Sequence, residues 1–359
     1  MKKKVGIVTW YNSDNYGSQL QAYALSRVVN SLGFEANMIT TSRHPVVRSI
    51  LDTLLYHTLL GRMYVFLKTN EQRLIFNKKY LKECYIDLRR PSFFKLHNMI
   101  CGSDQIWAPN LYNPIFMLSF VPDEVNKVSY AASIGLEEIP DCLVEKYKHY
   151  IGRINHVSVR EDKGKNLLKE RCGIESTVVL DPTLLVNKEV WDQIKKESTI
   201  KSQYLFCYFL RKDHKYRDLV KKYAENYGLD IYGISDNPND GEWMHLFNHR
   251  QVGPCEFIGL VEGAHTVITD SYHGTIFSLL YHKRFVLFER FDIEDKICQN
   301  SRIEQLKTYF NIGENIVRQD VIPSLFLSSC KLIDFNDFER KLSKLRIYSM
   351  NYLREALIP

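Results

Sequence analysis

The chain has 359 residues, of which 45% are hydrophobic and 25% charged, and its net charge is +6 at pH 7. This length exceeds one typical core, so two domains are expected, and the composition is that of a globular protein. No run reaches the roughly 18 apolar residues that span a bilayer, which argues against a membrane-spanning protein. The short apolar run Lys4–Trp10 ends in polar residues, so it is interpreted as a first strand rather than a signal peptide.

Eight cysteines are scattered along the chain without a CxxC pair or a Cys/His cluster. This pattern is typical of a cytoplasmic protein and predicts neither a metal nor another cofactor. The charge is uneven, because residues 1–100 hold 15 Lys and Arg against 6 Asp and Glu. A basic first third suits an anionic substrate, an anionic polymer or a membrane surface, and a solvated basic face explains it equally well. No aromatic-basic RNA motif accompanies the charge, so nucleic acid is not expected as a partner.

The first elements in chain order form a β-loop-α-β unit. Lys4–Trp10 is predicted as a strand, and a polar loop with turn residues follows at 12–17. Apolar residues then recur at helical spacing as far as Leu32, Gly33 ends the helix, and Glu35–Thr40 is predicted as a second strand. This order is typical of the opening of a Rossmann-like domain.

Residues 43–90 interrupt the pattern with a basic, aromatic and mainly helical insertion. Its most apolar part, Ile50–Leu60, suits a helix that lies on a membrane surface or grips a lipid-linked acceptor. A helix packed on the core explains the same residues. The expected location is therefore the cytoplasm, with the inner face of the membrane as a further option.

The remaining elements alternate between strands and helices. Strands are predicted at 99–101, 127–133, 156–160, 177–180, 204–210, 229–233, 266–269 and 285–288. Helices are predicted at 138–152, from 161 to Cys172, and at 214–227, 254–263, 272–282 and 335–357. The expected fold class is α/β, with two Rossmann-like domains facing a cleft in a GT-B-like arrangement and a C-terminal helix returning to the N-terminal domain. The expected bounds are 1–180 for the acceptor side, 190–333 for the donor side and 334–359 for the helix.

Polar residues follow several strands, where doubly wound sheets bind their ligands. The first group lies between the first strand and the first helix, where backbone amides and the helix dipole suit an anion or sugar hydroxyls. Its candidates are Asp14, Asn15, Tyr16, Gly17 and Gln21. Many helices begin in this way, so this group alone is a weak signal.

Two further groups follow later strands of the first half. Ser103 and Asp104 stand in Gly102–Gln105, a segment that suits either substrate binding or an ordinary turn. Arg160 ends another strand, where its guanidinium suits a carboxylate or phosphate held in bidentate fashion. A surface ion pair with Glu161 or Asp162 is the alternative for Arg160.

The strongest candidate is His273, on the first turn of a helix that directly follows a buried strand. Ser271, Gly274 and Thr275 accompany it, and Gly274 leaves room beside the imidazole. The segments after the next strand are expected to reach the same pocket and add Arg290, Asn300 and Arg302. A structural histidine is the alternative interpretation of His273.

Taken together, these segments resemble the polysaccharide pyruvyl transferase family. The matching pieces occur in family order over about residues 5–310: Asn15–Gly17 with Leu20–Leu25, Gly102–Trp107, Ser158–Glu161, Asp181–Thr183, and Ile268–Asp270 with His273–Gly274. The resemblance implies a GT-B-like fold and transfer of pyruvate from phosphoenolpyruvate to a sugar, as a ketal, in a bacterial surface polysaccharide or its precursor. The acceptor is then a sugar or a lipid-linked oligosaccharide, and peripheral contact with a membrane is an option.

The resemblance also implies that His273 is the catalytic histidine and that Arg160 matches an arginine that holds the donor. Asp104 or Asp14 is then expected to orient the sugar hydroxyls. Much of the family has Arg two residues before this histidine, where this chain has Ser271. Arg302 or Arg290 is expected to supply the missing charge. A nucleotide-sugar glycosyltransferase and a non-catalytic glycan-binding relative remain the alternative functions.

Overall fold

The computed structural model describes residues 2–12, 15–41, 71–88, 96–210, 217–235, 238–247, 252–290, 300–318, 326 and 328–358. The chain divides into two compact units. Unit 1 comprises Met1–Ile134, Glu138–Leu185 and Ser349–Pro359, and unit 2 comprises Gly135–Glu137 and Val186–Tyr348. Within the described ranges, no helix combines the length and the apolar content that crossing a membrane requires.

Unit 1 is built on a five-stranded parallel sheet in the order β3-β2-β1-β4-β5. Its strands are β1 (Lys4–Val8), β2 (Glu35–Thr40), β3 (Glu83–Tyr85), β4 (Leu96–Cys101) and β5 (Asn126–Ser129). The central strands are apolar on both faces because helices cover a parallel sheet on both sides. The short parallel pair β6 (Ser158–Val159) and β7 (Thr177–Val178) lies beyond β5. Single bridges connect Val128 of β5 with His156, and Ala132 after β5 with Val159 of β6.

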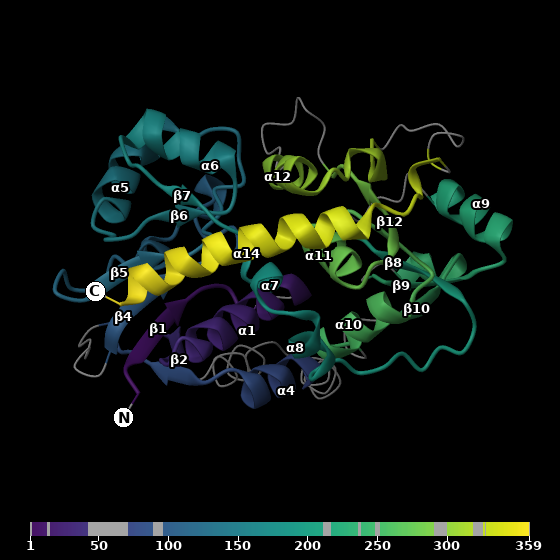
Figure 1. Cartoon of the computed structure of the whole chain (residues 1–359), viewed down its shortest axis with the longest axis horizontal. Helices are drawn as coiled ribbons and strands as arrows, with labels where there is room; N and C mark the ends of the chain where they lie inside the picture. Colours follow the sequence, from purple (N-terminus) through teal and green to yellow (C-terminus); the bar gives the residue numbers. More distant parts are fainter. Residues whose placement is uncertain are drawn as a thin grey trace, which may run out of the picture. The chain divides into compact units, whose positions relative to one another are not determined.

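The helices of unit 1 connect these strands, as Figure 1 shows. They are α1 (Tyr16–Ser31), α4 (Glu71–Tyr80), the 3-10 turns η1 (Pro109–Leu111) and η2 (Pro114–Met117), α5 (Asp141–Ile151), α6 (Asp162–Leu167), the π-helical turn η3 (Leu168–Cys172) and α7 (Pro182–Leu185). The sequence predicted one strand over 127–133, but β5 ends at Ser129. Ala131 has a φ of 51°, a left-handed conformation that interrupts a strand.

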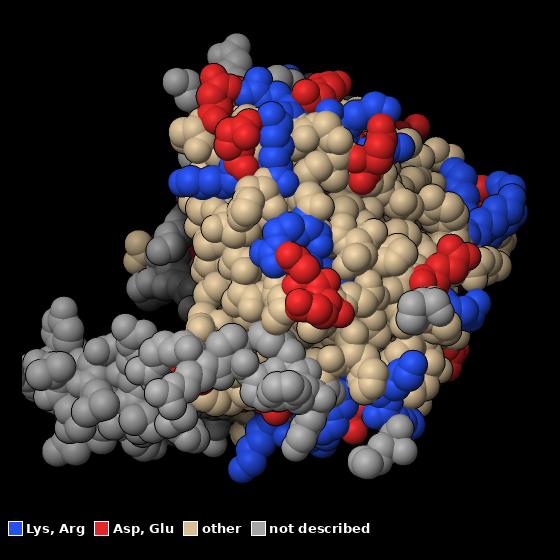
Figure 2. Space-filling model, turned by 90° about the vertical axis from the view of Figure 1, so that its left-hand side faces the viewer, with Lys and Arg blue, Asp and Glu red and all other residues tan. Residues whose placement is uncertain are grey.

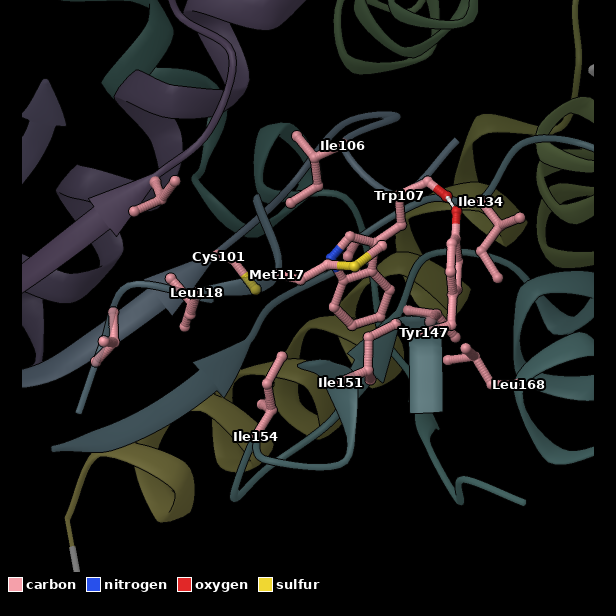
Figure 3. Packing of buried hydrophobic residues seen from close by; sticks show 14 of the residues in the cluster. Cys101, Ile106, Trp107, Met117, Leu118, Ile134, Tyr147, Ile151, Ile154 and Leu168 are labelled. Atoms are coloured by element: carbon pink, nitrogen blue, oxygen red, sulfur yellow. Dashed lines mark hydrogen bonds between the residues drawn. The ribbon is translucent and has the colours of Figure 1, made fainter. Parts of the chain in front are cut away.

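A large apolar cluster fills unit 1 between the sheet and α5 (Figure 3). Trp107 and Tyr147 are fully buried at its centre, and the Tyr147 hydroxyl donates a hydrogen bond of 2.5 Å to the carbonyl oxygen of Trp107. The indole N–H of Trp107 donates to the carbonyl of Phe116. Trp107 therefore anchors the segment that begins at Gly102, and it packs in the core.

Unit 2 repeats the plan with a six-stranded parallel sheet in the order β10-β9-β8-β11-β12-β13. Its strands are β8 (Tyr204–Tyr208), β9 (Asp230–Ile234), β10 (His245–Phe247), β11 (Thr266–Thr269), β12 (Arg284–Phe288) and β13 (Ile316–Val317). Its helices are α8 (Lys188–Asp192), α9 (Arg217–Tyr227), η4 (Pro238–Glu242), α10 (Pro254–Gly263), α11 (Tyr272–Leu280), α12 (Ser301–Phe310), η5 (Gly313–Asn315) and most of α14 (Phe335–Leu357).

The end of α14 packs on the first sheet, as expected for a C-terminal helix that returns to the N-terminal half. Asn126 donates to the carbonyl of Ala356 at 2.8 Å, and Tyr352 donates to the carbonyl of Ser129 at 3.1 Å. Both acceptors and donors belong to unit 1. The α/β class and the two parallel Rossmann-like sheets predicted from the sequence are confirmed.

Candidate functional site

The sheet of unit 2 has its topological switch point between β8 and β11. The chain passes outward from β8 to β9 and β10, and then returns to β11 on the other side of β8. In such sheets, ligands bind beyond the carboxyl ends of the two strands at the switch point. Asp270 follows β11 there, and its carboxylate accepts a hydrogen bond of 2.7 Å from the backbone N–H of Leu210, which follows β8. This contact ties the two strand ends together.

Ser271 begins helix α11 at this switch point. It has extended backbone angles, and its hydroxyl accepts a hydrogen bond of 3.3 Å from the N–H of Gly274, so Ser271 is the N-cap of the helix. Thr275 donates back to the Ser271 carbonyl at 3.1 Å. The sequence presented Ser271 as a missing positive charge, whereas the structure shows that it stabilises the first turn that carries His273.

Gly274 lets this first turn approach strand β11. A Cβ atom at this position would lie 2.6 Å from the Thr269 hydroxyl oxygen, a distance that Cβ atoms do not tolerate. That hydroxyl is held in place because it donates to the carbonyl of Tyr208 at 2.6 Å. Gly274 therefore sets the close packing of α11 on the sheet. That it leaves room beside the His273 imidazole stays a prediction.

His273 is 3% exposed and lies in contact with an aromatic neighbour. Its ring packs edge-on against Tyr272, with the centroids 5.2 Å apart. The Arg302 guanidinium lies over the Tyr272 ring at 5.7 Å, a distance typical of a cation–π contact. The structure thus brings together two predicted site residues, His273 and Arg302, through Tyr272, which was not among the predicted site residues.

Arg302 and Asn300 both lie at the start of α12. The backbone carbonyl of Asn300 accepts from the N–H groups of Ile303 and Glu304, so Asn300 forms the first turn of this helix. Arg290 follows the end of β12 and is half-buried. These positions place two arginines in the segments after β12, the strand next to β11, as expected from the sequence.

The switch point of unit 1 lies between β1 and β4, and there the predicted residues form one buried hydrogen-bond network. Gln21 donates to the Thr9 hydroxyl and to the carbonyl of Trp10, and its side-chain oxygen accepts from the N–H of Ser103 at 3.1 Å. Ser18 donates to the Asp104 carboxylate at 2.5 Å. Gln21, Ser103 and Asp104 were predicted from the sequence. Thr9 and Ser18 were not, because only the folding of β1 beside β4 brings them into contact with these residues.

Arg160 lies at the centre of this network and is 2% exposed. Its guanidinium is 2.8 Å from the Asp181 carboxylate, 3.8 Å from Glu161 and 3.9 Å from Asp104. The alternative of a surface ion pair is therefore wrong, because the arginine and its partners are buried. Asp181 compensates the charge of Arg160, and donor binding by Arg160 stays a prediction.

Asp181 joins several pieces of the network. It accepts from the Ser103 hydroxyl at 3.2 Å and from the backbone N–H and hydroxyl of Thr183 at 2.9 and 2.6 Å. Burial, followed by the charge of Asp181, raises the pKa of the Tyr130 hydroxyl well above its ordinary value. Asp181–Thr183 resembles the family, but no site role was predicted for it. Its position directly after the predicted strand 177–180 was the signal that could have indicated one.

Asp104, predicted to orient substrate hydroxyls, is 4% exposed and has a φ of 75°. A positive φ is uncommon outside glycine and is over-represented at functional sites. Its carboxylate accepts from Ser18 and from the N–H of Gln105, and a substrate contact by Asp104 stays a prediction. Asp14, the other candidate for this role, lies outside the described residues.

Asn15 and its neighbours begin helix α1. The Asn15 side chain accepts from the N–H of Gly17 at 2.9 Å and is the N-cap. Tyr16 is fully buried, with the Arg73 guanidinium 5.3 Å from its ring centroid. These residues hold the loop after β1, and their contact with a substrate stays a prediction.

Basic and acidic side chains lie beside one another on the face shown in Figure 2. In unit 1, Lys82 and Lys4 lie 2.7 and 3.8 Å from Glu35, and Lys82 lowers the pKa of that carboxyl. Within the described residues, this pairing favours a solvated face over a concentrated basic patch. Ile50–Leu60 and most of the insertion 43–90 lie outside the described residues.

Two parallel sheets with polar residues at both switch points define an α/β protein with the GT-B-like, two-unit fold. The model of the polysaccharide pyruvyl transferase family matches residues 15–292, which include β4 in unit 1 and both strands of the switch point in unit 2. The chain therefore belongs to the polysaccharide pyruvyl transferase family, a family of transferases. No curated relative matches its sequence.

Solved structures show the same fold at low sequence identity. The UDP-GlcNAc 2-epimerase from Neisseria meningitidis bound to UDP-GlcNAc is 12% identical over 100% of both chains, with a TM-score of 0.55. A putative UDP-N-acetylglucosamine 2-epimerase from Listeria monocytogenes is 10% identical, covers 98% of this chain and 94% of its own, and has a TM-score of 0.52. At these identities the likeness establishes the fold alone.

Proposed function

We propose that the protein transfers pyruvate from phosphoenolpyruvate to a sugar of a surface polysaccharide or its precursor, and forms a pyruvate ketal. The observation that carries the proposal is the position of His273. It stands on the first turn of α11, directly after the strand at the switch point of unit 2, with Arg302 in reach through Tyr272. Family membership supports a transferase of polysaccharide biosynthesis.

The proposed reaction begins with a proton from the His273 imidazolium to the methylene carbon of phosphoenolpyruvate. This makes C2 electrophilic, and one sugar hydroxyl forms a C–O bond to it. A second hydroxyl of the same sugar forms the other C–O bond as the bond from C2 to the phosphate oxygen breaks. The two sugar hydroxyls lose two protons in total. The product side holds the same number, one as the new hydrogen of the methyl group and one on the inorganic phosphate that leaves.

The anionic donor requires positive charge. Many family members supply it with an arginine at the position of Ser271, and Arg302 is the proposed source in this chain. Its guanidinium lies 5.7 Å from the centroid of the Tyr272 ring, beside the first turn of α11. Arg290, after β12, is the second proposed contact. Donors of this kind stabilise the charge that builds up on a departing phosphate.

The test measures released phosphate and the mass of the glycan after incubation of the full chain with phosphoenolpyruvate and candidate glycans. We expect His273→Gln to lower kcat by about 10²- to 10⁴-fold, because proton transfer by a positioned side chain contributes that much. The matched control is His265→Gln, since His265 precedes β11 at the opposite end of the same strand. Near-normal phosphate release by His273→Gln would refute the acid role.

A further inference from the structure

A pocket of about 330 Å³ lies at the carboxyl ends of β1 and β2 in unit 1. Its lining comes from the loop after β1, the loop after β2 and the turn η2. The volume is at the lower end of ligand pockets, which run from about 300 to 1,000 Å³, and suits one ring of a larger ligand. The pocket lies in unit 1, whereas the residues of the proposed chemistry at His273 all belong to unit 2.

Aromatic side chains form one part of the lining. Trp10 and Phe116 are both half-buried, and their rings meet edge-on with the centroids 5.8 Å apart. The contact holds the indole in place and leaves it partly exposed to the pocket. A partly exposed, immobilised indole presents a flat apolar face, which the C–H groups of a sugar ring can cover.

Asn113 adds a hydrogen-bond donor to the lining. Its side-chain oxygen caps η2 by accepting from the N–H of Ile115 at 3.1 Å. Within the described part of the chain, its NH₂ group donates to no protein acceptor and remains able to donate to a ligand oxygen. Thr40, Thr41 and Asn12 supply further polar atoms.

The described residues of the lining are uncharged, which restricts the class of ligand that they favour. Among the described residues that line the pocket there is no Lys, Arg, His, Asp or Glu. Burial, followed by the charge of Glu83, raises the pKa of the Tyr11 hydroxyl, so that Tyr11 stays neutral. A phosphate-bearing donor would lose its hydration here without gaining a cation. The pocket therefore disfavours phosphoenolpyruvate and nucleotide sugars.

We infer that this pocket binds a neutral pyranose ring of the acceptor glycan, with Trp10 stacked on the ring and Asn113 donating to a ring hydroxyl. The inference rests on the proposed function, because it names the binding place of that reaction's acceptor. Gln21 is a positioning residue for the subsite, since its side-chain NH₂ holds the carbonyl of Trp10 at 3.0 Å. Gln21, which belongs to the family motif and is buried, thus acts on the subsite through Trp10.

The first experiment titrates the full chain with the methyl glycosides of glucose, galactose and mannose and follows tryptophan fluorescence. The chain has four tryptophans, and Trp107, Trp191 and Trp243 are buried. We therefore expect saturable binding of at least one glycoside to change the emission. Trp10→Phe should abolish the change, whereas Trp243→Phe, the matched control in unit 2, should retain it.

The second experiment measures affinity for the bound glycoside by ligand-observed NMR. Asn113→Asp keeps the oxygen that caps η2 and removes the NH₂ donor, so the melting temperature should stay unchanged while affinity falls by about 5- to 10-fold. Trp10→Leu should weaken binding by about 10-fold. Affinity for phosphoenolpyruvate, measured on the same variants, should not change.

The outcomes separate this inference from the proposed function. Three results would overturn the sugar subsite, even where phosphoenolpyruvate-dependent phosphate release is intact. They are the absence of saturable binding, an unchanged glycoside affinity in both variants, and competition by uridine diphosphate. Glycoside binding that depends on Trp10 and Asn113, without turnover of phosphoenolpyruvate on any glycan, supports the subsite and overturns the pyruvyl transfer.

Discussion

The guanidinium of Arg160 shows how far a residue's role depends on its partners. In the sequence, Arg160 ends a strand, where an arginine suits an anionic donor. In the structure it is buried against Asp181 at 2.8 Å, in a network that also includes Ser103 and Thr183. A buried carboxylate of this kind is stabilised mainly by its cation, so Arg160 holds the strand ends of unit 1 together.

We expect Arg160→Ala to lower the free energy of unfolding by about 3–5 kcal/mol, because it leaves the Asp181 carboxylate buried without its cation. Chemical denaturation followed by circular dichroism measures this change. Lys148→Ala is the control, since Lys148 forms an exposed pair with Glu145 that contributes little. A loss for Arg160→Ala no larger than that of the control would contradict the structural role of Arg160.

At the scale of elements, helix α11 is the part of the site that the sequence describes best. The apolar run 266–269 and the polar residues after it predict that this helix follows a buried strand. The predicted helix ran to 282, whereas α11 ends at Leu280, because His282 adopts a left-handed φ of 52°. The helix depends on two local features, the Ser271 cap and the contact of Gly274 with Thr269.

Gly274→Ala should move α11 away from β11, because the added Cβ would lie 2.6 Å from the Thr269 hydroxyl oxygen. Overpacking of this kind typically costs about 1–3 kcal/mol of stability. The shift should also displace His273 and lower kcat. Thermal unfolding and the phosphate-release assay measure both effects.

Gly241→Ala is the control for Gly274→Ala, since no atom lies within 4 Å of a Cβ at that position. We expect a change within about 0.5 kcal/mol for this variant. Equal stability and activity in the two variants would show that α11 does not need the close approach.

At the scale of the whole molecule, both units have a parallel sheet with a switch point, and the polar motifs follow the strands at these points. Unit 1 has β1 beside β4, and unit 2 has β8 beside β11. The two sheets differ in what surrounds the switch point. Unit 1 carries a buried network and a pocket whose described lining residues are uncharged, whereas unit 2 carries His273 and Arg302. This difference favours an anionic donor at unit 2.

Phosphoenolpyruvate should stabilise the protein, because a ligand that binds only the folded state adds to the free energy of unfolding. At 100 times the dissociation constant the gain is about 2.7 kcal/mol. Hydrogen exchange should show the protection at the start of α11 and of α12. Stabilisation by nucleotide sugars with none from phosphoenolpyruvate would favour the glycosyltransferase alternative instead.

The sequence by itself determined the fold class, the order of most elements and the family, and it predicts a role for His273. These follow from local information: apolar periodicity, turn residues and short motifs are all read within a few positions of the chain. Short elements such as β10, β13 and α12 were not predicted, because strands of two or three residues and a helix of ten residues give little periodic signal.

Only the tertiary structure decided which motif residues meet. Ser18 reaches Asp104 across 86 positions, and Arg160 reaches Asp181 across 21, so their pairing depends on the strand order of the sheet. The same strand order creates the pocket that Trp10 and Asn113 share. Residue types and spacing predict a polar strand end, but burial and distance decide whether a side chain there supports the fold or remains available to a substrate.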